Sequence, residues 1–173
     1  TKGRVGFNIV TGLNPGGLAD NLGTDLREHD ARYERAEEFM QVCYSLWQSW
    51  DADALVRDPE KPLFADPDKV HEIHFKGDYF SCRGPSQLPR SPQEIPVTFQ
   101  AGQSPRGRQF AARHAEGVFT ISPDLPAMQA YYRDVKDRVA NEGRRESDLA
   151  ILTGIFPIVG ASEAAAKEKY EKL

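Results

Sequence analysis

The sequence has only two cysteines in 173 residues, Cys43 and Cys82. Two thiols cannot build the disulfide framework of a small secreted domain, so reduced, packed cysteines and a cytoplasmic location are expected. No apolar run approaches the roughly 20 residues that span a bilayer, and the first residues lack the long apolar region of a signal peptide. These absences predict a protein that is neither exported nor inserted into a membrane.

Basic residues are too few to form a nucleic-acid surface. Lys and Arg together number 22 against 26 Asp and Glu, which gives a formal net charge of -4, and the basic residues are scattered along the chain. Nucleic acid is therefore excluded as an expected partner. With 39% apolar and 28% charged residues, the chain is typical of one globular domain over residues 1–173.

Motifs for metal binding and hydrolysis are also missing. His71 and His74 lie three residues apart, so on a strand they point to opposite faces, and the HExxH spacing of zinc proteases is not met. The chain has no Gly-x-Ser-x-Gly elbow, and neither cysteine has the sequence signature of a nucleophile. We expect no metal site, and no catalytic residue can be named.

Hydrophobic patterning predicts alternating strands and helices. The expected strands span 5–10, 96–100, 117–121 and 149–160, and the expected helices span 26–50, 105–116, 122–143 and 162–173. Asp25 and Glu28 offer a capping-box pattern, and Ser104 with Pro105 forms a helix start. A β-hairpin is expected around 70–82, followed by a Pro-rich connector.

The order of these elements predicts an α/β fold with a parallel sheet covered by helices. Two architectures fit, a doubly wound open sheet and a (β/α)8 barrel. A barrel needs roughly 250 residues, and the four strand–helix units here make about half of one. Because the chain begins almost on a strand and ends within a helix, we expect it to be the central portion of a longer barrel.

A glycine-rich turn between 96–100 and the next helix is a candidate phosphate site. Gly102 and Gly107 have the spacing of a P-loop, but Arg108 and Gln109 stand where Lys and Ser or Thr are required, so a nucleotide triphosphatase is not expected. Backbone N–H groups at a helix start, with the Ser104 hydroxyl, can still attract an anion. The alternative is that Ser104 only caps the helix.

The sequence pattern alone leaves the roles of three further polar residues undecided. Arg32 and Tyr33 could give a phosphate a cation and a phenolic donor, or Tyr33 could belong to the apolar stripe with Arg32 in water. Asn8 lies in an apolar strand, so we expect it to be buried and to need a partner in the fold or a ligand.

Four stretches, in this order and spacing, resemble one family: GRVGFNIVTG, EHDARYERAEEFMQVCYSLWQSWDADALVRD, FADPDKVHEIHFKGDYFSCRGP and PVTFQAGQSPRGRQFAARHAEGVFT. They are similar to the flavin-dependent monooxygenases grouped with nitrilotriacetate, dibenzothiophene-sulfone and long-chain alkane monooxygenases, in the bacterial luciferase-like superfamily. The likeness covers nearly the whole chain. It implies a luciferase-like (β/α)8 TIM barrel, with the hairpin at 70–82 as an insertion.

The resemblance also implies a cofactor and partners. Family members take reduced FMN from an NAD(P)H-dependent flavin reductase, use O2 to oxygenate a small organic substrate, and are usually homodimers. Carried over by position, the implied FMN-binding residues are Asn8, Thr11, Arg32, Tyr33, Gly102, Gln103 and Ser104. Gln103 departs from a common serine and Gly12 from a larger polar residue. These departures keep open a non-catalytic flavin- or phosphate-binding module. A doubly wound phosphate-ester-binding protein is a third, less favoured alternative.

Overall fold

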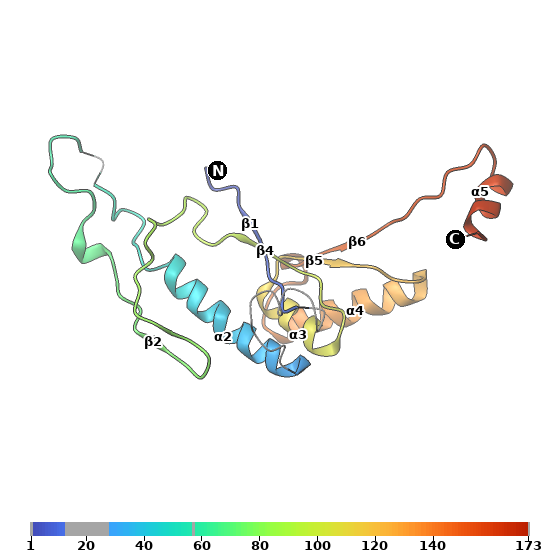
Figure 1. Ribbon diagram of the computed structural model, residues 1–173, viewed down its shortest axis with the longest axis horizontal. Coiled ribbons are helices and arrows are strands. Elements are labelled where there is room, and N and C mark those ends of the chain that lie inside the picture. Colours follow the sequence, from blue (N-terminus) through green and yellow to red (C-terminus); the bar gives the residue numbers. More distant parts are fainter. Residues whose placement is uncertain (1, 13–27, 57, 173) are drawn as a thin grey trace.

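The computed structural model describes residues 2–12, 28–56 and 58–172. Four short strands form its central parallel sheet, in the order β1 (Gly6–Asn8), β4 (Val97–Gln100), β5 (Gly117–Thr120) and β6 (Ala150–Thr153) (Figure 1). The spatial order follows the chain without reversal. A doubly wound sheet reverses its strand order at a switch point, whereas a barrel does not, so the described strands fit a barrel wall.

Helices follow the strands and begin where the local sequence caps them. They are α2 (His29–Trp47), α3 (Pro105–His114), α4 (Leu125–Asn141) and α5 (Glu163–Tyr170). The predicted starts at 105 and 162 are confirmed within one residue, and α4 begins after Asp124, whose Oδ1 accepts the Ala127 N–H at 2.8 Å. Within the described residues, no helix combines the length and apolar character that crossing a membrane requires.

The predicted helix end at Trp50 is wrong, because α2 ends at Trp47. The Ser49 hydroxyl donates to the Leu46 carbonyl at 2.7 Å, and Trp50 turns away to form an isolated bridge with Val70. Local side-chain hydrogen bonding therefore ends the helix before the apolar spacing does. At the other end, Glu28 makes no side-chain cap, and Asp25 of the expected capping box lies outside the described residues.

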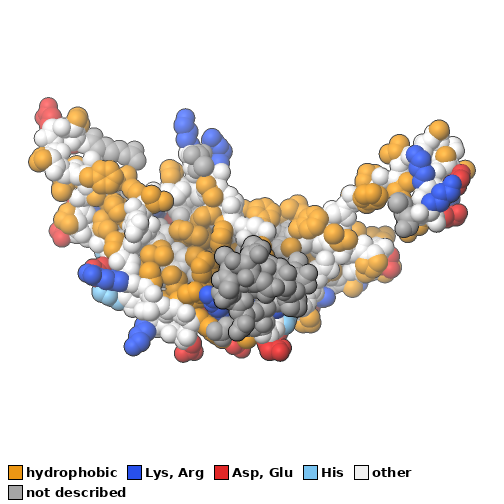
Figure 2. Space-filling view, viewed as in Figure 1, with side chains coloured by type: hydrophobic (Ala, Val, Ile, Leu, Met, Phe, Trp, Pro, Cys, Tyr) orange, Lys and Arg blue, Asp and Glu red, His pale blue; other side chains and the backbone are white. Residues whose placement is uncertain are grey.

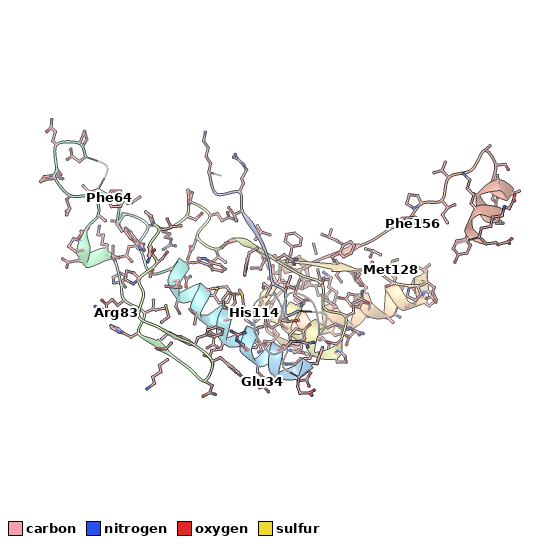
Figure 3. All side chains as sticks on the ribbon, viewed as in Figure 1. Glu34, Phe64, Arg83, His114, Met128 and Phe156 are labelled. Atoms are coloured by element: carbon pink, nitrogen blue, oxygen red, sulfur yellow. The ribbon has the colours of Figure 1, made fainter. Side chains whose placement is uncertain are left out.

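The predicted strand over 149–160 is also too long. β6 ends at Thr153, and its last hydrogen bond to the sheet runs from the Gly154 N–H to the Thr120 carbonyl at 2.8 Å. Beyond it an extended arm, residues 154–162, carries α5 away from the sheet, with Ile155 83% and Phe156 81% exposed (Figures 1 and 3). An apolar run predicts a strand only where a neighbouring strand is present to pair with it.

The excursion between α2 and β4, residues 51–95, contains the predicted hairpin. Its strands β2 (Phe75–Lys76) and β3 (Ser81–Cys82) are antiparallel, which confirms the hairpin with shorter strands than expected. A short 3-10 turn, η1 (Pro67–Lys69), precedes it. The Glu38 carboxylate of α2 accepts the N–H groups of Tyr79 and Phe80 at 2.9 and 2.6 Å, so the hairpin is anchored to α2.

Helices cover one face of the sheet. Fully buried Val118, Val135, Val139 and Leu149 pack between the sheet and α3 and α4, and the short turn η2 (Glu146–Asp148) leads into β6. A second cluster forms where α2 meets α3. On the other face, Val97, Phe119 and Leu152 are 40–47% exposed, and apolar side chains are prominent over the middle of the molecule in Figure 2. This one-sided cover is how helices surround a barrel.

Candidate functional site

A cavity of about 420 Å³ lies at the carboxyl ends of β1 and β4, beside the first turns of α2 and α3. Its described lining includes every residue that the resemblance implied for FMN: Asn8, Thr11, Arg32, Tyr33, Gly102, Gln103 and Ser104. These residues come from three separate segments of the chain. The pairing of β1 with β4 brings two of these segments together, and the packing of Tyr33 against Phe110 of α3 brings α2 to them.

Tyr33 belongs to the apolar stripe of α2, and its hydroxyl also lies at the cavity. Its side chain is only 4% exposed and its ring packs against that of Phe110, with 5.6 Å between ring centroids, so it belongs to the core between α2 and α3. Its hydroxyl reaches the glycine turn. A Cβ atom at Gly102 or at Gly107 would stand 2.6 Å from the Tyr33 Oη. Both positions must therefore be glycine for the turn to close around this hydroxyl.

Gln100, which the sequence did not single out, also lines the cavity. Its side chain is buried, and its Oε1 accepts the Gly102 N–H, which fixes the start of the turn. The strand pattern held a signal for this residue, because Thr98 and Gln100 share a side of β4 by the two-residue period and both are buried polar side chains.

Ser104 caps α3, as the simpler of its two expected roles requires. Its Oγ accepts the Gly107 N–H at 3.0 Å. A serine hydroxyl that accepts one hydrogen bond still carries its own hydrogen and can donate it. The cap and the anion-binding role are therefore compatible, and the helix start places partial positive charge at the cavity.

The charge of the lining favours an anion. No Asp or Glu is present among the described lining residues, whereas Arg32 is half-buried there, and it is not simply solvated. Thr11 and Gly12 are half-buried at the same wall. The prediction that Asn8 is buried is wrong: it is exposed, because among the described strands β1 is an edge strand paired only with β4.

A part-buried polar cluster joins α2 to α3 next to the site (Figure 3, His114). The Glu37 carboxylate accepts from His114 Nε2 at 2.7 Å and pairs with Arg113 at 3.1 Å. Tyr44 Oη lies 3.1 Å from His114 Nδ1, and burial raises the pKa of Tyr44, so its phenol keeps its proton.

Histidines and cysteines elsewhere do not converge on a reactive site. Within the described residues, no three His, Cys, Asp or Glu side chains are placed to hold a metal. His71 and His74 pair with Asp51 and Glu72, each at 3.0 Å. Burial raises the pKa of Cys43 to about 11, so this thiol stays protonated at neutral pH.

Comparison with known proteins identifies the family. The family model described as luciferase-like monooxygenase matches residues 1–173. The chain belongs to the luciferase-like monooxygenase family. It is 49% identical over 172 residues to the dibenzothiophene-sulfone monooxygenase of Rhodococcus erythropolis, and 44% identical over 172 residues to nitrilotriacetate monooxygenase component A of Aminobacter aminovorans. Each match covers 99% of this chain and 38% of the relative.

Solved structures of similar proteins share its fold. The crystal structure of a long-chain alkane monooxygenase matches with a TM-score of 0.88 at 42% identity, over 98% of this chain and 39% of that one. A riboflavin lyase, solved with modified FMN and its substrate riboflavin, matches with a TM-score of 0.90 at 36% identity, over 99% and 38%. This luciferase-like chain therefore spans less than two fifths of those proteins, and its four described strands form an unclosed part of the α/β fold.

Proposed function

We propose that this chain forms the phosphate-binding side of a monooxygenase that uses reduced FMN and O2. The proposal rests on one observation. Arg32, Tyr33 and Ser104 line the same cavity in a chain of the luciferase-like monooxygenase family. The donors of this cavity fit a phosphate monoester, since a guanidinium, a hydroxyl and a helix start surround it without a carboxylate among the described lining residues.

The residues of this chain contribute binding and orientation. The reduced flavin, when bound, supplies the activation of O2. In this proposal Arg32 would neutralise phosphate charge, Ser104 would donate a hydrogen bond, and the Gly102 turn would form the cavity wall beside the phosphate. Asn8 and Thr11, at the carboxyl end of β1, are the proposed contacts for the rest of the cofactor. Fixing the phosphate end limits the positions that the reactive ring can take.

A flavin reductase that uses NAD(P)H is the proposed source of reduced FMN. The relative from Aminobacter aminovorans is named as component A, which supports a two-component system. The substrate is a small organic molecule of unassigned class, and a homodimer is the proposed assembly.

The test uses the full-length protein with FMN, NADH or NADPH, and a flavin reductase. Anaerobic titration with reduced FMN should show saturable binding, and a substrate panel of sulfones, alkanes and aminopolycarboxylates should reveal substrate-dependent O2 uptake. Absence of reduced-FMN binding would refute the proposal. Binding without O2 uptake on any substrate would favour the non-catalytic flavin-binding module instead.

Ser104→Ala should weaken the affinity for reduced FMN by roughly 1 kcal/mol or more, about fivefold, because a hydrogen bond to a charged group is lost. Ser162→Ala is the matched control, since Ser162 caps α5 through the Ala165 N–H at 3.2 Å and does not line the cavity. Isothermal titration of both variants separates the loss of a cap from the loss of a ligand contact. Equal affinities in the two variants would count against Ser104 as a ligand.

Arg32→Ala should weaken reduced-FMN affinity by about tenfold at low ionic strength, with a smaller effect at high salt, because salt screens a charge pair that is only half-buried. The Ser104→Ala effect should lack this salt dependence. Arg35→Ala on the same helix is the control, since the Arg35 guanidinium lies 5.0 Å from the ring centre of Phe80, away from the cavity. An Arg32→Ala effect independent of salt would contradict a role for its charge.

A further inference from the structure

Arg108 occupies the position at which a P-loop would carry its lysine, yet it does not line the cavity. Its side chain instead bonds to the backbone of the glycine turn and to α4. Its Nε donates to the Gln103 carbonyl at 2.8 Å, and its Nη1 donates to Asp134 Oδ2 of α4 at 2.8 Å. One guanidinium thus joins the turn to α4.

Tyr131 of α4 holds the neighbouring peptide of the same turn. It is 6% exposed, and its phenol donates to the Gly102 carbonyl at 3.4 Å. Burial raises the pKa of Tyr131, so this donor keeps its proton. The Arg108 guanidinium also lies over the Tyr131 ring, 5.1 Å from its centre. The two side chains therefore contact each other, and each donates a hydrogen bond to one of two consecutive carbonyls of the turn.

The direction of a carbonyl fixes the direction of the N–H in the same peptide, because the two are opposed in a planar trans unit. The Gly102 carbonyl shares its peptide with the Gln103 N–H, and the Gln103 carbonyl shares its peptide with the Ser104 N–H. Both carbonyls are held on the α4 side of the turn. Their N–H partners point the opposite way, and residues 102–104 line the cavity.

We propose that Arg108 and Tyr131 are positioning residues that orient two backbone N–H groups of the turn toward the cavity and so select phosphorylated over unphosphorylated flavin. This inference rests on the proposed function. It also explains how glutamine can stand at position 103, because the proposed contact with the phosphate comes from the backbone N–H and the Gln103 side chain is exposed. Asp134 holds Arg108 in place. Although burial raises its pKa, hydrogen bonds from Arg138 and Arg108 keep the pKa of Asp134 below its usual value.

The experiment titrates the full-length protein anaerobically with reduced FMN and with reduced riboflavin, which lacks the phosphate. Arg108→Lys keeps the charge but loses the planar guanidinium, whose separate N–H groups bond to both Gln103 and Asp134. We expect it to weaken reduced-FMN affinity by about tenfold and to leave reduced-riboflavin affinity unchanged. Tyr131→Phe should act in the same direction, and the double variant should lose less than the product of the two single losses, because both residues hold one turn.

Arg138→Lys is the matched control. Arg138 pairs with the same Asp134 at 3.0 Å but makes no hydrogen bond to the turn. Its replacement should preserve the preference for FMN, even if it lowers the apparent Tm as much as Arg108→Lys does. A structural role of Arg108 alone would change the Tm and not the ratio of the two flavin affinities.

The outcomes separate the two proposals. If the unmodified protein prefers FMN and Arg108→Lys keeps that preference, the positioning role is overturned and the phosphate site stands. If the unmodified protein binds both flavins equally, the phosphate site and the positioning role are both overturned. A selective loss of FMN affinity in Arg108→Lys, absent from Arg138→Lys, supports the inference.

Discussion

Replacing Gly102 with alanine should weaken binding of reduced FMN by roughly 100-fold in the full-length protein. The added Cβ would stand 2.6 Å from the Tyr33 Oη and 2.9 Å from both side-chain amide atoms of Gln100. Tyr33 cannot retreat, because its ring is packed against Phe110 in the core. Overpacking of this kind costs about 1–3 kcal/mol, and here the turn that forms the cavity wall must move.

Two variants show whether the steric conflict is the cause. Gly6→Ala adds the same methyl group on β1, where the nearest atom is the Val97 carbonyl oxygen at 3.7 Å, and should leave flavin affinity unchanged. Combining Gly102→Ala with Tyr33→Phe removes the hydroxyl that the methyl meets and should restore part of the lost affinity. If Gly102→Ala and Gly6→Ala bind reduced FMN equally well, the turn does not form the flavin site.

Glu37→Gln should lower the stability of the full-length protein by about 3 kcal/mol at neutral pH, seen as a fall in the apparent Tm by scanning calorimetry. The carboxylate joins α2 to α3 through His114, Arg113 and Arg106, and its side chain is only 14% exposed. An amide in its place keeps one acceptor oxygen but turns an NH2 group toward the donors on the other side and removes the negative charge. Glu34→Gln, one turn earlier, is the control, because Glu34 accepts one exposed hydrogen bond from Tyr79 at 3.0 Å.

The Glu37 effect should also depend on pH. Burial raises the pKa of Glu37, but hydrogen bonds and charge from His114 and Arg113 outweigh it and hold the pKa below its ordinary value of 4.5. A carboxyl group whose folded pKa is depressed stabilises the fold above the unfolded pKa, and loses that contribution as the pH falls through the folded pKa. The Tm difference between Glu37→Gln and the unmodified protein should therefore shrink below about pH 4.5. A constant difference across this range would contradict the ionic role.

Local chemistry allowed much of the fold to be predicted from sequence. The starts of α3 and α5 follow from serine caps, and the end of α4 near Gly143 follows from a residue with φ of 73° that glycine adopts easily. The predicted ends of α2 and β6 were wrong because each end depends on residues that are distant in the sequence. Trp50 lies outside α2 and pairs with Val70, whereas Ile155 and Phe156 lie beyond the end of the sheet. The nearby sequence indicates neither of these positions.

The sequence predicted which residues line the cavity, but not which contacts hold the glycine turn in place. Arg32, Tyr33 and Ser104 line one cavity as the family resemblance implied, whereas each alone fitted a plain structural role. Gln100 and Arg108 were missed as site residues because they act on the backbone of the turn. Such contacts depend on the path of the chain in space. The two-residue period of β4 puts Gln100 on the same side as Thr98 but does not indicate its contact with the turn, and no residue type or spacing predicts the contact made by Arg108.

The strand pairing described above has a consequence for the evolution of chain length. β1 pairs directly with β4, although residues 51–95 separate α2 from β4, and none of these residues lines the described part of the cavity. The entropy of closing a flexible loop grows only with the logarithm of its length, by about 0.6 kcal/mol for each doubling. Outside the hairpin that Glu38 anchors to α2, the excursion can therefore lengthen or shorten at little thermodynamic cost, while the cavity at the ends of β1 and β4 keeps its geometry.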